Sequence, residues 1–95
     1  MLVTIEKKDM RGAKRFLCSC CVVTKALQRV FESSNISFSG RHIRIKDQVL
    51  FSVLESQAGA IASDFDQKKD VVGRTFEITE SNVAKILTAI HNTVV

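Results

Sequence analysis

The feature that most constrains this chain is a stripe of apolar residues at helical spacing near its N-terminus. Asp9 is a plausible N-cap, and Ser33-Ser34-Asn35 provides the end signal. Between them, apolar residues recur every three or four positions and line one helical face: Ala13, Phe16, Leu17, Cys20, Thr24, Leu27, Val30 and Phe31. The sequence therefore predicts one long amphipathic helix over residues 10–33.

Alternating and β-rich runs lie on both sides of this stripe. Residues 2–6 form a short β-rich run, and residues 36–39 and 42–46 alternate around Gly40, which predicts a hairpin. Residues 71–78 read as a strand with Phe76 and Ile78 facing inward. Thr79 or Ser81 caps a final helix, and its apolar positions are Val83, Ile86, Leu87 and Ile90.

Residues 47–66 admit two interpretations. A helix capped by Asp47 would have the apolar stripe Leu50, Leu54, Ala58, Ile61 and Phe65. Against the helix, Gly59 in its interior costs about 1 kcal/mol relative to Ala. Val49, Phe51 and Val53 could instead alternate as a strand after a turn. The helix is preferred, and the strand remains the alternative over residues 48–56.

With the helix, the order of elements is βαββαβ followed by a helix. That order predicts an α+β fold, the ferredoxin-like split βαβ sandwich with an extra C-terminal helix. The 95 residues correspond to a single globular domain, 1–95. If residues 49–55 are a strand, the α+β class survives with a three-stranded meander.

The net charge of +4 is unevenly distributed along the chain. Residues 1–46 carry ten basic and three acidic side chains, whereas residues 47–95 carry four basic and seven acidic ones. In the ferredoxin-like topology, the first βα loop, the hairpin turn and the second αβ loop share one end. The basic residues expected to converge there are Lys7, Lys8, Arg11, Lys14, Arg15, Arg41, Lys68 and Lys69. Such an end suits an acidic partner, although a solvated rim that binds nothing is the alternative.

The open face of the predicted sheet is polar. If Ile43 and Ile45 face the core, His42, Arg44 and Lys46 face outward, and Arg44 joins the expected partner-binding residues. The order of elements resembles the RNA-recognition motif, whose central strands carry aromatic residues that stack on bases. Here no aromatic residue occupies those positions, so base-specific RNA binding by that mode is not expected.

No constellation of residues indicates catalysis, a cofactor or a metal. Cys18, Cys20 and Cys21 are too clustered for a zinc site, and His42 and His91 supply no pairing pattern. Cys20 and Cys21 are better explained as small buried side chains. Three clustered cysteines and the absence of a signal peptide point to a reducing, cytoplasmic location. The apolar runs are too short for a membrane span.

The leading hypothesis is a small non-catalytic regulator or inhibitor that docks on a larger protein or nucleoprotein complex with an acidic surface. A second face of the first helix, with Cys18, Val22, Lys25 and Arg29, could contact that partner or a second copy in a homodimer. The alternative is sequence-independent nucleic-acid binding through the basic loop end. No membrane partner is expected.

Overall fold

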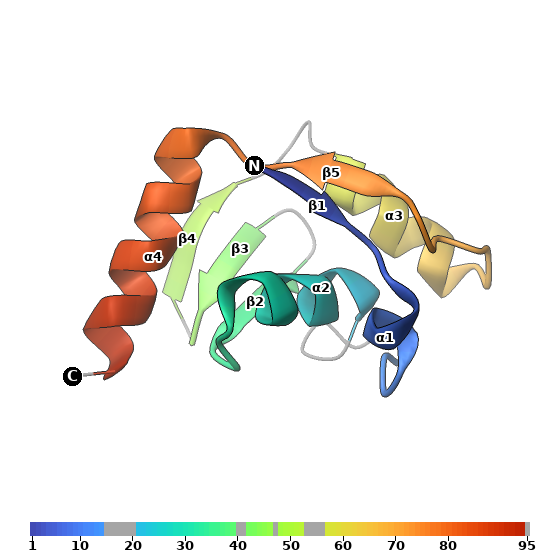
Figure 1. Cartoon of the computed structure of the whole chain (residues 1–95), viewed down its shortest axis with the longest axis horizontal. Coiled ribbons are helices and arrows are strands. Elements are labelled where there is room, and N and C mark those ends of the chain that lie inside the picture. Colours follow the sequence, from blue (N-terminus) through green and yellow to red (C-terminus); the bar gives the residue numbers. More distant parts are fainter. Residues whose placement is uncertain (15–20, 40–41, 47, 53–56, 95) are drawn as a thin grey trace.

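The computed structural model describes residues 1–14, 21–39, 42–46, 48–52 and 57–94. These residues form a mixed α+β arrangement of two antiparallel sheets and four helices (Figure 1). The elements in chain order are β1 (Leu2–Thr4), α1 (Lys7–Met10), α2 (Val22–Phe31), β2 (Ile36–Ser39), β3 (His42–Ile45), β4 (Gln48–Ser52), α3 (Gln57–Asp66), β5 (Thr75–Glu77) and α4 (Glu80–Val94).

The strands form two separate sheets. The smaller one pairs β1 with β5 and sets Val3 opposite Phe76. The larger one has the order β2-β3-β4, and its first two strands are the hairpin that the alternating pattern predicts. Ile43 and Ile45 are buried as expected. The α+β class is therefore confirmed, together with the hairpin.

The ferredoxin-like strand order is not found. In that topology the first strand pairs with the third, but here β3 has β2 on one side and β4 on the other. Both edges of β3 are therefore filled by its own chain neighbours, and β1 pairs with β5 instead. The fold thus contains a three-stranded meander, which follows from the strand alternative at residues 48–56.

The preferred helix over residues 47–66 is wrong in its first part. Residues 48–52 form β4, because Lys46 adopts a left-handed conformation (φ 53°) and turns the chain back onto β3. The helix α3 begins only at Gln57, and it buries Ala58, Ile61 and Phe65 as the stripe predicts. Leu54 lies outside the described residues.

The predicted helix over residues 10–33 is also wrong at its start. The chain forms the single turn of α1, then reverses at Gly12, whose φ of 73° favours glycine. The long helix α2 begins at Val22, with Cys21 rather than Asp9 as its N-cap. It ends at Glu32, which has a φ of 51° and donates its backbone N–H to the Gln28 carbonyl. The stripe residues Thr24, Leu27 and Phe31 are buried.

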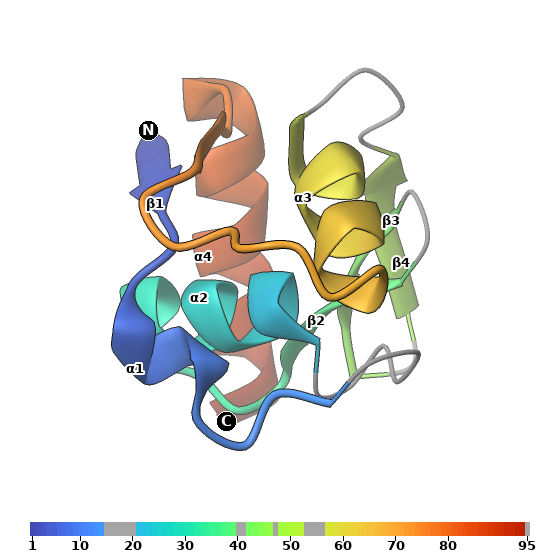
Figure 2. The same ribbon diagram turned by 90° about the vertical axis from the view of Figure 1, so that its right-hand side faces the viewer.

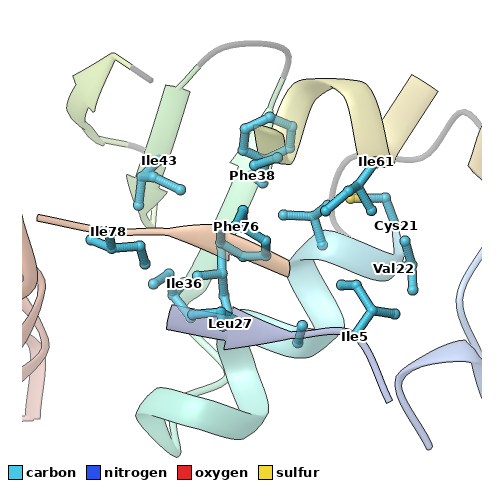
Figure 3. Packing of buried hydrophobic residues seen from close by; sticks show 14 of the residues in the cluster. Ile5, Cys21, Val22, Leu27, Ile36, Phe38, Ile43, Ile61, Phe76 and Ile78 are labelled. Atoms are coloured by element: carbon cyan, nitrogen blue, oxygen red, sulfur yellow. The ribbon is translucent and has the colours of Figure 1, made fainter. Parts of the chain in front are cut away.

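A single core joins the two sheets. Helix α2 packs against β1, β2 and α3, so the apolar faces of both sheets meet around it. Figure 3 shows Leu27 of α2 close to Ile36 of β2 and Phe76 of β5, and Ile61 of α3 belongs to the same cluster. These four side chains are each at most 1 % exposed.

Helix α4 is attached at one side of the molecule, alongside β4 (Figure 1). It contacts β3 and β4, and among its described side chains Ile86 is the one fully buried apolar residue. Val83 and Ile90 pack against the core in part, as predicted. Leu87 does not, because it is 53 % exposed. The sheet surface under α4 therefore covers a narrower stripe of the helix than the sequence predicts.

Candidate functional site

An ion pair between Arg29 and Asp9 organises one end of the molecule. The Asp9 side chain is 2 % exposed, whereas that of Arg29 is 27 % exposed. Arg29 donates to Asp9 twice, from Nε at 2.9 Å and from Nη2 at 3.1 Å. Its Nη2 also donates to the carbonyl oxygen of Thr4 at 2.7 Å, and its Nη1 lies 2.9 Å from Glu6 Oε2. A bidentate contact of this kind fixes both partners in orientation.

The same carboxylate holds the short helix α1 in place. Asp9 Oδ2 accepts a hydrogen bond at 2.8 Å from the backbone N–H of Glu6, the N-cap residue of α1. Hydrogen bonding to Asp9, with the charges of Asp9 and Glu6, raises the pKa of Arg29 despite partial desolvation. A four-residue helix has little stability of its own. We conclude that Arg29 anchors α1 to α2 and to the end of β1.

A second ion pair joins the last turn of α3 to the loop that follows it. Arg74 Nη1 donates to Asp64 Oδ2 at 2.5 Å, and Lys69 Nζ lies 3.6 Å from Asp64 Oδ1. The hydrogen bond from Arg74, together with the nearby positive charges, lowers the pKa of Asp64 below its ordinary value of 3.8. The Asp64 side chain is 26 % exposed, so water screens this pair more than it screens Arg29 and Asp9.

Backbone hydrogen bonds connect the two ion-paired segments. Ile5 donates to the carbonyl of Arg74 and accepts from the N–H of Gly73, both at 2.8 Å. Glu6 and α1 follow Ile5 directly, so the 67–74 loop is tied to the start of α1. Figures 1 and 2 show α1 and this loop at the same end of the molecule, the end that faces the viewer in Figure 2. We call residues 6–14, Arg29 and residues 64–74 the basic end.

The basic end carries eight basic and five acidic side chains, a net charge of +3. Lys8 pairs with Glu6 at 3.6 Å. Four further cations are exposed and form no ion pair with the described residues: Lys7, Arg11, Lys14 and Lys68. The anchored carboxylates therefore neutralise Arg29 and Arg74, while the outward charge comes from these four side chains and from the exposed Lys8 and Lys69.

The structure brings together part of the predicted set. Lys7, Lys8, Arg11 and Lys14 lie on or just after α1, and Lys68 and Lys69 follow α3 at the same end. Arg44 lies on β3, in the other sheet. The sequence predicts an outward-facing side chain, and the structure shows a half-buried one. Arg15 and Arg41 lie outside the described residues. The topology that predicted the convergence is wrong, and the Ile5 hydrogen bonds provide the connection instead.

The anchoring residues were not identified from the sequence. Arg29 was assigned to a second surface face of the first helix with Val22, but Val22 is fully buried. The sequence indicates Asp9 as the N-cap of a long helix, but Asp9 is buried and paired with Arg29. The only sequence signal for Asp9 is its position three residues after Glu6, the spacing of a capping box.

Cys21 is the one cysteine among the described residues, and it has a structural role at the start of α2. It is buried, and its Sγ accepts the N–H of Thr24 at 3.4 Å as the N-cap of α2. Thr24 Oγ1 in turn accepts the N–H of Phe38 in β2 at 2.9 Å. In the described part of the chain, no group of three or more potential ligands is placed to hold a metal ion.

Comparison of the chain with known proteins found no match. No protein-family model, no curated protein and no solved structure matches the chain. Among the described helices, none has both the length and the apolar character needed to cross a membrane.

Proposed function

We propose that this chain is a non-catalytic binding domain that docks through its basic end on an acidic surface of a larger protein or nucleoprotein complex, and thereby regulates or inhibits it. The observation that carries the proposal is the buried ion pair between Arg29 and Asp9. It holds α1 against the core, so the cations around α1 are presented on a fixed scaffold rather than on a loose loop.

The mixture of charges at this end favours a protein partner over bare nucleic acid. Phosphate backbones are matched best by a surface of one sign, but Asp66 and Asp70 lie among the cations of the 64–74 segment. Protein interfaces commonly pair interspersed charges on both sides, which fixes orientation and speeds encounter.

The burial of the aromatic residues also favours a protein partner over nucleic acid. Binding to single-stranded nucleic acid uses exposed aromatic rings on which bases stack. The described phenylalanines other than Phe51, whose side chain is not described, are all buried: Phe31, Phe38, Phe65 and Phe76. Direct nucleic-acid binding through phosphate contacts alone remains the alternative, and its salt dependence distinguishes it.

The test is the charge-reversed double variant Lys7→Glu/Arg11→Glu. Both side chains are exposed and without a described ion pair, so the reversal should leave the free energy of unfolding nearly unchanged. The tagged wild-type protein should retain a protein partner from nuclease-treated cytosol, and the double variant should lose it. With the purified partner, we expect the affinity to fall by at least tenfold in the variant.

The control is Ser34→Glu/Gln57→Glu, which also adds two carboxylates at exposed positions but outside the basic end. This control should retain the partner. A partner held equally well by Lys7→Glu/Arg11→Glu would show that the basic end is not the docking surface. Binding that disappears with nuclease, or that falls steeply and log-linearly with salt on a 20-base-pair DNA duplex, would support the nucleic-acid alternative.

A further inference from the structure

A groove separates α4 from the turn between β3 and β4, and Figure 1 shows α4 on the side of the molecule opposite to the basic end. Its volume is about 910 Å³, which is in the range of ligand-binding clefts. The apolar part of its lining comes from both walls: Ile45 and Leu50 on the sheet side, and Ala84 and Ala89 on α4. The small alanine side chains on α4 leave this space unfilled.

Among the residues that the structure describes, the charges that line the groove are of one sign. Lys46 and Lys85 lie on opposite walls, and the remaining polar lining residues are uncharged amides and threonines. Neither lysine forms an ion pair with a described residue. The groove therefore combines an apolar floor with two cations that lack a described counter-charge, which suits an anionic ligand with apolar groups.

One wall of the groove is an edge strand. Strand β4 pairs with β3 on one side, and within the described residues no strand pairs with its other side. Figure 1 shows α4 running alongside β4, with β3 on the opposite side of β4. An edge strand presents unpaired N–H and C=O groups that accept an added strand. Here that edge lies next to the groove.

We propose that the groove binds an extended acidic peptide, a segment of another protein, which adds as a strand to the free edge of β4 beneath α4. The main chain of the peptide would pair with β4. Alternate side chains would point into the groove, where aliphatic groups meet Leu50 and Ala89. Carboxylates of the peptide would meet Lys46 and Lys85 at the two walls.

The dimensions of the two walls agree with this occupant. Strand β4 has five residues, which span about 17 Å at about 3.3 Å per residue. The part of α4 that lines the groove runs from Ala84 to Thr93, which spans about 14 Å at about 1.5 Å per residue. Among the described residues of β4, only Gln48 and Leu50 line the groove, so the α4 wall sets its length, which a strand of about four residues matches.

A second copy of the chain is a poorer occupant than an acidic peptide. If β4 paired with β4 of another copy, the added strand would be Gln48-Val49-Leu50-Phe51-Ser52, which carries no carboxylate. The lysines of both copies would then approach one another, with no counter-charge from the described residues of either groove. Charge complementarity thus selects an acidic segment from a different protein.

The test begins with a displayed library of random eight-residue peptides selected on the wild-type protein. We expect enrichment of peptides in which aliphatic residues alternate with Asp or Glu. The most enriched sequence, synthesised with a fluorescent label, is then the probe for affinity by fluorescence anisotropy. Replacing its acids with Gln should weaken binding by at least tenfold. N-methylation of alternate backbone nitrogens should abolish binding in one register and be tolerated in the other, because only every second N–H faces β4.

Two pairs of variants test the position of the peptide. Thr88→Trp places a large side chain in the groove and should abolish binding, whereas Leu87→Trp, on the exposed neighbour outside the groove lining, should not. Lys85→Glu should weaken binding by at least tenfold, and the matched reversal Lys68→Glu at the basic end should have no effect. Circular dichroism confirms that each variant is folded.

Several results would overturn the proposal. These are the enrichment of no peptide, binding insensitive to N-methylation in both registers, and loss of binding in Leu87→Trp to the same extent as in Thr88→Trp. Binding of laurate in place of any peptide would show a small-amphiphile site instead. A homodimer that Thr88→Trp dissociates would show that the second copy occupies the groove. Because Lys7→Glu/Arg11→Glu leaves this groove intact, failure here is distinguishable from failure of the basic end.

Discussion

The two ends of this molecule use charge in opposite ways. At the basic end, the buried Asp9 and the partly buried Asp64 each form an ion pair with an arginine, so these charges are neutralised within the protein. At the α4 groove, Lys46 and Lys85 have no described carboxylate partner and lie beside apolar lining. At the basic end the ion pairs thus stabilise the scaffold that carries the exposed cations, whereas at the groove the cations themselves line an apolar site.

The difference also concerns what holds each end to the core. Helix α1 is a single turn, and its attachment depends on the hydrogen bonds of Arg29 to Asp9 and to the Thr4 carbonyl. Helix α4 has 15 residues and is attached mainly by packing, with Ile86 as its buried anchor. An end held by ion pairs should respond to charge changes, and an end held by packing should respond to cavities.

The largest expected effect on the free energy of unfolding is therefore that of a cavity under α4. Ile86→Ala should lower the free energy of unfolding by about 3 kcal/mol, because it removes a fully buried side chain and leaves a cavity. Leu87→Ala, its exposed neighbour, should change it by less than about 0.5 kcal/mol. Urea unfolding of both variants measures the difference, and hydrogen exchange should show α4 losing protection first in Ile86→Ala. Equal losses in the two variants would mean that α4 packs through a different face.

The contrast between Ile86 and Leu87 also marks a limit of sequence interpretation. Their spacing with Val83 and Ile90 correctly predicts an amphipathic helix over this region, because helical periodicity is a local property. How wide a stripe is buried depends on the surface beneath it. That surface is one end of the β3–β4 pair, and its existence depends on residues 48–52 forming a strand.

The second prediction concerns the ion pair of the basic end. Arg29→Ala should lower the free energy of unfolding by about 2 to 3 kcal/mol, because Asp9 would remain buried without its partner. Partial exposure of Arg29 keeps the loss below that of a fully buried pair. The double variant Arg29→Ala/Asp9→Ala should recover part of the loss, since no unpaired charge remains. Thermal unfolding of the wild type, Arg29→Ala, Asp9→Ala and the double variant closes this cycle, and strictly additive effects would contradict the coupling.

Local patterns predicted much of the fold, and contacts distant in sequence account for what they missed. The alternation of residues 36–46 and the stripe of Thr24, Leu27 and Phe31 depend on neighbouring residues, and both are found. The break at Gly12 depends on α1 turning so that Asp9 reaches Arg29, 20 residues away. No spacing rule encodes such a pair. For the same reason the basic end was predicted only in part, and the groove was not predicted.

The smallest expected effect is the acid response of the second ion pair at the basic end. The pKa of Asp64 is lowered in the folded protein, chiefly by its hydrogen bond from Arg74. A carboxyl with a depressed folded pKa contributes stability above its unfolded pKa, near 3.8, and loses that contribution as the pH falls through its folded pKa. Stability should therefore decrease below about pH 4 more in the wild type than in Asp64→Asn, which lacks the titrating group.

Carboxyl-detected NMR measures this titration directly. The pKa of Asp64 should lie below 3.8 in the wild type and move up towards that value in Arg74→Met, which removes the main cause. Backbone amides of residues 64–74 should shift with the titration. Amides that line the α4 groove should not shift with Asp64, because no described carboxylate lines the groove. A pKa at or above 3.8 in the wild type, or groove amides that titrate with Asp64, would remove the contrast between an end stabilised by internal ion pairs and a groove whose lysines have no described counter-charge.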